Sequence, residues 1–177
     1  MRLCRLDLPT NDRGTSVLEF ALLLPLLLLL LIGMVDLCVL LDSELRLTHL
    51  SREAANVFSR GAGFDETFAA LANADGNLQL DGWNGRAILT KISLHPTTGA
   101  PMITAQRTMG GLNRSSSVGT LPPGATSAPA SVPNGRVIPP NMSLVVVELF
   151  SQQQHFYGRS RLAPGQGNIV LGSLAAF

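Results

Sequence analysis

Charge is scarce in this sequence: only 14% of its 177 residues are Asp, Glu, Lys or Arg, and the formal net charge is +1. The 13 Lys and Arg residues are scattered along the chain, and none of them forms a basic run. Ordered nucleic-acid-binding domains usually gather their positive charge on one face or along one helix. We therefore expect no nucleic-acid partner.

Cysteine is also rare, and both cysteines lie near the N-terminus. Cys4 precedes a long apolar run and Cys38 lies within it, so neither belongs to the region that follows. This placement excludes a disulfide inside that region and argues against a two-cysteine metal site there. The bulky Leu37 before Cys38 argues against a lipoprotein signal, so we interpret Cys38 as a lipid-facing side chain.

Motifs that carry enzymatic chemistry are missing. His49, His95 and His155 have no Cys or carboxylate partner at metal-ligand spacing. The serines at 115–117 lack the nucleophile-elbow pattern, and the glycines at 110–111 do not join a strand to a helix as phosphate-binding loops do. We predict no catalytic residue, no metal site and no cofactor, and hence a protein that is not an enzyme.

What the sequence does contain is one long apolar segment. From Phe20 to Leu41 the only charged residue is Asp36. A helix of this length rises about 33 Å, enough to cross a hydrocarbon core of about 30 Å, and Pro25 and Gly33 are tolerated in such a span. A cleaved secretory signal is the alternative, but the run is longer than a signal's apolar core and no A-x-A-like site follows it. We predict an uncleaved transmembrane helix.

The helical pattern continues beyond the span. Apolar residues recur at helical spacing as far as Phe58, and Gly61 is a natural stop. We predict one continuous helix from Thr15 to Arg60, about 69 Å long. Its distal half is an amphipathic stalk that needs a partner surface, either its own domain or another subunit. The predicted apolar face consists of Leu47, Leu50, Ala54, Val57 and Phe58.

A small α+β domain is predicted after the stalk. Alternating and β-branched segments bounded by turn residues indicate strands of an antiparallel sheet. The Gly-, Pro- and Ser-rich stretch 110–141 is typical of a mobile loop without a packed core. We expect the sheet to pack on the distal part of the long helix. The predicted elements are a helix at Phe64–Ala74 and strands at Arg86–His95, Pro101–Thr108, Ser143–Ser151 and Asn168–Phe177.

Glu19, at the start of the apolar run, needs an explanation. A carboxylate near membrane depth is costly unless it faces water or finds a partner, which favours a functional role. The alternative is an acid at a helix N-terminus, stabilised there by the helix dipole. The residues alone leave both interpretations open. For Asp36, near the far end of the span, we favour a side chain that reaches the interface or meets a basic group.

These features together resemble a known family. The segment RGTSVLEFALLLPLLLLLLIGMVDL is similar to the start of TadE-like proteins, minor pseudopilins of bacterial tight-adherence (Flp-type) pilus systems. The shared features are Gly14 closing a polar leader, Glu19-Phe20 five residues on, and the apolar run with Pro25. HLSREAANVFSRGAG resembles the segment that ends the family's helix, and SLVVVELFSQQQHF resembles its late strand more loosely. The Flp-type major pilins have Glu-Tyr where this chain has Glu19-Phe20, and they lack a substantial domain. TadF and TadG proteins share the N-terminal pattern, so the type within the group stays open.

The resemblance implies a function and a processing site. A prepilin peptidase would cut after Gly14, Thr15 would become the new N-terminus, and Glu19 would pair with the N-terminal amine of a neighbouring subunit. The implied organisation is a cytoplasmic leader at 1–14, a transmembrane and stalk helix at 15–61, and an extracytoplasmic domain at 62–177 anchored in the bacterial inner membrane. The implied partners are membrane lipid, the prepilin peptidase, other pseudopilins and Flp pilus assembly components. The alternative is an uncleaved, membrane-anchored binding module facing the periplasm or cell wall.

Overall fold

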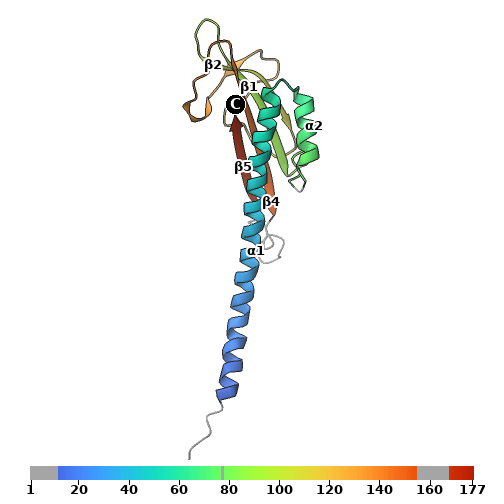
Figure 1. Ribbon diagram of the computed structural model, residues 1–177, viewed down its shortest axis with the longest axis vertical. Helices are drawn as coiled ribbons and strands as arrows, with labels where there is room; N and C mark the ends of the chain where they lie inside the picture. Colours follow the sequence, from blue (N-terminus) through green and yellow to red (C-terminus); the bar gives the residue numbers. More distant parts are fainter. Residues whose placement is uncertain (1–11, 77, 155–167) are drawn as a thin grey trace, which may run out of the picture. The chain divides into compact units, whose positions relative to one another are not determined.

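The computed structural model describes residues 12–76, 78–154 and 168–177. It has a long N-terminal helix followed by a five-stranded antiparallel sheet, which confirms the predicted α+β class (Figure 1). The chain divides into two compact units, Met1–Cys38 and Val39–Phe177, and the division falls within the first helix. Each unit is described by itself below.

Helix α1 runs from Asp12 to Ser59 and contains Pro25. The predicted start at Thr15 is three residues late, because the first turn also includes the polar residues before it. The predicted end at Arg60 is close to the observed one. The amide of Arg60 donates to the Asn56 carbonyl, and Gly61 then adopts a positive φ of 101° that L side chains rarely adopt, which stops the helix.

The C-terminal unit contains a second helix, α2 (Phe64–Ala74), at the residues that the sequence predicts. At its start the Glu66 carboxylate accepts a hydrogen bond from the Gly63 amide, as in a capping box. At its end the Asp75 carboxylate accepts a hydrogen bond from the Leu80 amide at 2.8 Å. This last bond fixes the turn that leads from α2 into the sheet.

The sheet has the strand order β3-β2-β1-β4-β5, and every neighbouring pair is antiparallel. The predicted hairpin is confirmed, as are the predicted strands that begin at Ser143 and Asn168. The two-residue β3 lies within the stretch predicted to be a loop. The strand bounds are β1 Gly85–Leu94, β2 Pro101–Met109, β3 Ala128–Pro129, β4 Ser143–Gln154 and β5 Asn168–Ala176.

One face of the sheet packs against the two helices. On the central strands it presents Leu89 and Val147, both with no exposed surface, and α2 contributes Leu71. The distal part of α1 therefore packs on its own domain. Val57 is the exception in the predicted apolar face, since its side chain is 38% exposed. The α1 residues in this core are Leu47, Leu50, Ala54, Ala55 and Phe58.

The opposite face of the sheet is covered by the stretch 110–141. Val118 and Ile138 from this stretch are 1% and 6% exposed, and they pack on Ile92, Leu144 and Val146 of the sheet. The prediction that the stretch lacks a packed core is therefore wrong. Although most of it is irregular and it contains only β3 and one turn of 3-10 helix (Pro133–Gly135), it forms the third layer of the unit.

Candidate functional site

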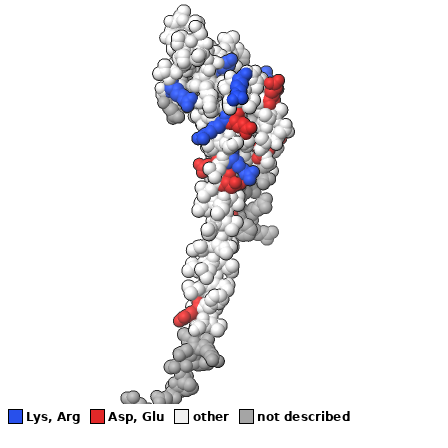
Figure 2. All heavy atoms as spheres, in the orientation of Figure 1, with Lys and Arg blue, Asp and Glu red and all other residues white. Residues whose placement is uncertain are grey.

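The N-terminal part of α1 is the first candidate site, because it exposes an uninterrupted apolar surface. Most of its large apolar side chains between Val17 and Leu41 are 42–78% exposed, and only Ile32 and Leu40 are less exposed. Figure 2 shows almost no charged side chain on this part of the helix, whereas charged residues gather on the C-terminal unit. Exposed apolar surface of this extent is unfavourable in water and matches the solvent properties of a lipid bilayer.

Among the described residues, α1 is the one helix long and apolar enough to cross a membrane. The predicted span Phe20–Leu41 lies wholly within it, and Phe20 is 61% exposed. This single apolar helix near the N-terminus indicates a membrane anchor.

Glu19 lies on the exposed surface of α1, one residue before the predicted span. No side chain that the structure describes forms a hydrogen bond or ion pair with its carboxylate. Gly14 and Thr15 are both in the first turns of α1, so the Gly14–Thr15 peptide bond is within helical backbone. Asp36 lies further along the helix and is half-buried.

The other residues singled out in the sequence are not brought together. His49 lies on α1, with its Nδ1 3.7 Å from the Glu53 carboxylate, and His95 follows β1 with its Nδ1 2.9 Å from the Thr97 hydroxyl. Cys38 is a free, exposed thiol, whereas Cys4 and His155 lie outside the described residues. Within residues 12–76, 78–154 and 168–177, no group of three His, Cys, Asp or Glu side chains is placed to hold a metal ion.

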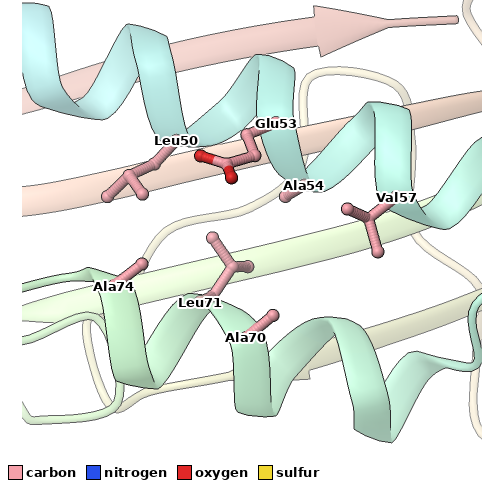
Figure 3. Close-up of a pocket in the computed structure, with 7 residues that line it drawn as sticks. All are labelled: Leu50, Glu53, Ala54, Val57, Ala70, Leu71 and Ala74. Atoms are coloured by element: carbon pink, nitrogen blue, oxygen red, sulfur yellow. The ribbon is translucent and has the colours of Figure 1, made fainter.

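A shallow apolar hollow of about 60 Å³ lies between α1 and α2 in the C-terminal unit. Figure 3 shows Leu71 pointing from α2 toward α1, where Leu50 and Ala54 face it. The α2 residues that line the hollow are Ala70, Leu71 and Ala74, so two of the three are alanine. The hollow is thus part of the contact between the two helices and carries no convergent polar groups beyond Glu53. Its lining is Leu50, Glu53, Ala54, Val57, Ala70, Leu71 and Ala74.

Sequence reasoning missed a buried carboxylate that is hydrogen-bonded to two serines, a group that we call the Glu148 cluster. Glu148, in the middle of β4, is only 1% exposed and lies on the face covered by 110–141. Its carboxylate accepts hydrogen bonds from the Ser117 amide at 2.8 Å and from the hydroxyls of Ser116 and Ser117. A charged residue inside the apolar run LVVVELF was the available signal. These hydrogen bonds hold the 110–141 stretch against the sheet.

The Glu148 cluster gives a prediction on stability. Glu148→Leu removes the buried acceptor for three donors of Ser116 and Ser117, so we expect the free energy of unfolding to fall by about 2–4 kcal/mol, or the melting temperature by about 5–10 °C. Glu148→Gln keeps one carbonyl acceptor and should lose less. Thermal unfolding of the full chain in detergent checks this, and an unchanged melting temperature for Glu148→Leu would show that the cluster does not hold the layer in place.

These features define a class: a protein with one apolar membrane-anchor helix and a small α+β unit built on the end of the same helix. The model of the family described as TadE-like protein matches residues 14–56, about a quarter of the chain. The match confirms the resemblance over this segment and associates the chain with the tight-adherence pilus. No curated protein and no solved structure matches the chain.

Proposed function

We propose that this chain is a TadE-like minor pseudopilin, a membrane-anchored structural subunit in the biogenesis of tight-adherence pili. The observation that carries the proposal is a carboxylate, Glu19, without a described partner at the start of a helical segment whose apolar side chains are mostly exposed. The family match from residue 14 onward supports it, because the match begins at the residue where a leader would end.

Processing is the first step of the proposed mechanism. A prepilin peptidase on the cytoplasmic side of the inner membrane cleaves the Gly14–Thr15 bond and releases the leader. Because this bond lies in the first turns of α1, the helix start must unwind to enter the peptidase. Unwinding there is inexpensive, since the first four amides of a helix have no intrahelical acceptor. Glycine before the cleaved bond lets the enzyme approach the backbone closely.

Assembly is the second step. After cleavage Thr15 carries a free amine at the membrane surface, and Glu19 of one subunit pairs with the amine of its neighbour. An unpaired carboxylate in an apolar setting is unfavourable, so this pairing sets the register between two apolar helices. The C-terminal unit lies on the extracytoplasmic side, and lipid and other pseudopilins surround the anchor. The chain has no chemistry of its own in this mechanism.

The alternative function is an uncleaved anchored binding module whose 110–141 stretch contacts a partner. It predicts that Glu19→Ala leaves function intact. Deleting 110–141 is not a usable test, because this stretch covers one face of the sheet and its loss would expose Ile92 and Val146. Substitution of its exposed residue Val137, which is 90% exposed, tests the alternative without removing core contacts.

A complementation experiment tests the proposed function. Cells that lack this chain should lose surface pili and firm attachment, and the wild-type chain should restore both. Restoration by a chain with Val137→Lys is also expected, because this side chain is not part of the proposed mechanism. Normal piliation in cells without the chain would contradict the proposal.

A further inference from the structure

A polar pocket lies on the face of the sheet that the 110–141 stretch covers. Its volume is about 200 Å³, below the roughly 300–1,000 Å³ of pockets for drug-sized ligands, so it suits a small group. Strands β1 and β2 form its floor, and residues 113–120 form its wall. We call it the Arg86 pocket, and its lining is Arg86, Ile88, Gln106, Thr108, Asn113, Arg114, Ser115, Ser116 and Thr120.

Hydrogen bonds hold the wall of the Arg86 pocket at two points. At one point the Leu112 carbonyl accepts a hydrogen bond from the Arg86 guanidinium at 2.9 Å. At the other point Ser116 and Ser117 donate to the buried Glu148 carboxylate on β4. The segment between these two points therefore has fixed ends, and the pocket is formed before any ligand arrives.

On the floor of the pocket, Gln106 is held in place as well. Its side-chain amide donates to the Thr90 hydroxyl and to the Gly119 carbonyl, both at 3.0 Å, and its oxygen accepts from the Leu121 amide at 2.9 Å. Because both of its donors are used in this way, Gln106 shapes the pocket and does not bind a ligand. The donors that remain for a ligand are on Arg86, Thr108, Asn113, Arg114, Ser115 and Thr120.

The positive charge of the pocket lacks a carboxylate partner. Arg86 is half-buried and Arg114 is exposed, and neither forms an ion pair with a carboxylate in the part of the chain that the structure describes. The Nε of Arg86 is buried without a hydrogen-bond partner among these residues. Positions 77 and 155–167, the rest of the C-terminal unit, contain no Asp or Glu, so they cannot supply the missing acid.

Glu148 is the one acid bonded to the wall, and it does not neutralise both arginines. Its carboxylate oxygens accept the hydrogen bonds of Ser116 and Ser117. One buried carboxylate beside two guanidinium groups leaves an excess of positive charge in the pocket. A half-buried cation without a partner is unfavourable, so a bound anion would stabilise this arrangement.

We propose that the Arg86 pocket binds a phosphate group. Two guanidinium groups and several hydroxyl and amide donors surround the same small volume, and a tetrahedral phosphate offers more acceptor oxygens to them than a planar carboxylate does. Arginine is also the side chain that recognises phosphate with paired hydrogen bonds. The phosphate has two possible sources, a free ion or the headgroup of a membrane phospholipid, and the test separates them.

The binding test uses the full chain in a nonionic detergent, with inorganic phosphate as the probe. The amide chemical shifts of Arg114 and Ser115 are followed by nuclear magnetic resonance during the titration. We expect both amides to shift saturably with phosphate. Acetate should bind about tenfold more weakly, because it leaves charge-assisted hydrogen bonds unmade.

Three variants test whether the arginine of the wall binds the phosphate. Arg114→Gln should bind about tenfold more weakly, whereas Arg114→Lys keeps the charge and should bind within about threefold of wild type. The side chain is exposed, so both variants should fold, and equal melting temperatures check this. Arg107→Gln is the matched control, because this arginine lies on the other face of the sheet, 3.1 Å from the Asp65 carboxylate, and should bind like wild type.

Two lipids separate the sources of the phosphate. Phosphatidylglycerol carries its negative charge on a phosphate, whereas cholesteryl hemisuccinate carries it on a carboxylate. If a membrane headgroup fills the pocket, phosphatidylglycerol added to the detergent shifts the amides of Arg114 and Ser115, and cholesteryl hemisuccinate does not. If inorganic phosphate shifts these amides and neither lipid does, the ligand is the free ion.

Three outcomes would overturn the inference: no saturable shift with inorganic phosphate or phosphatidylglycerol, acetate binding as tight as phosphate binding, or equal weakening by Arg107→Gln and Arg114→Gln. The last would mean that charge attracts phosphate to the surface in general. The first two use the wild-type chain, so they decide even where a variant fails to fold. None of these readouts depends on leader cleavage or pilus formation, so their failure leaves the proposed function untouched.

Discussion

Gly14→Val should leave this chain at its full length of 177 residues in cells that contain an active prepilin peptidase. Valine has a branched side chain at the position where the peptidase must approach the backbone. Valine also has the higher helix propensity of the two residues, so it makes unwinding of the first turn less favourable than glycine does. We expect at least a tenfold lower cleaved fraction, because about 1.4 kcal/mol of lost transition-state binding already gives that factor. The intact mass of the membrane-extracted chain measures it directly.

Gly33→Ala is the matched control for this variant. Gly33 is in the same helix, and a Cβ added there meets no atom within 4 Å, so the substitution should change neither insertion nor cleavage. If Gly14→Val is cleaved as completely as Gly33→Ala, then Gly14 does not define the processing site. The family resemblance would then extend to the helix but not to the processing.

Glu19→Gln should be cleaved normally but should fail to assemble. The substitution keeps the shape and removes the charge that pairs with the neighbour's N-terminal amine. Breaking one partner of a buried ion pair typically costs about 3–5 kcal/mol, which lowers an association constant at least a hundredfold. We therefore expect loss of surface pili, counted by electron microscopy, with an unchanged amount of processed chain in the membrane.

Glu44→Gln provides the control, because Glu44 is an exposed acid on the same helix beyond the predicted span. It should assemble like wild type. Normal piliation with Glu19→Gln would mean that the acid is only a helix N-terminal residue stabilised by the dipole, which is the other interpretation that the sequence left open.

The long helix and the main strands could be predicted from the sequence because their signals are local. The apolar run sets the span, and Gly61 marks the end of α1 within two residues. Strands β1 and β2 show alternation on either side of a turn-rich segment, and β4 is β-branched and follows two prolines. Each of these patterns depends on neighbours within about ten residues, so composition and periodicity suffice.

The packing of the 110–141 stretch on the sheet and the Glu148 cluster could not be predicted, because the contacts that form them are distant in sequence. Val118 and Ile138 lie in a Gly- and Pro-rich stretch without helical or strand periodicity, and they are buried because they pack on the sheet face. Glu148 finds its donors at Ser116 and Ser117, more than 30 residues earlier in the chain. The strand order β3-β2-β1-β4-β5 likewise depends on contacts distant in sequence, which periodicity does not specify.

The most direct test of the central claim is the N-terminal sequence of the chain extracted from membranes of cells with an active prepilin peptidase, compared with cells whose peptidase is inactive. The account predicts that the chain begins at Thr15 in the first cells and retains Met1–Gly14 in the second. A chain that retains its leader in both would contradict the account and leave an ordinary anchored domain.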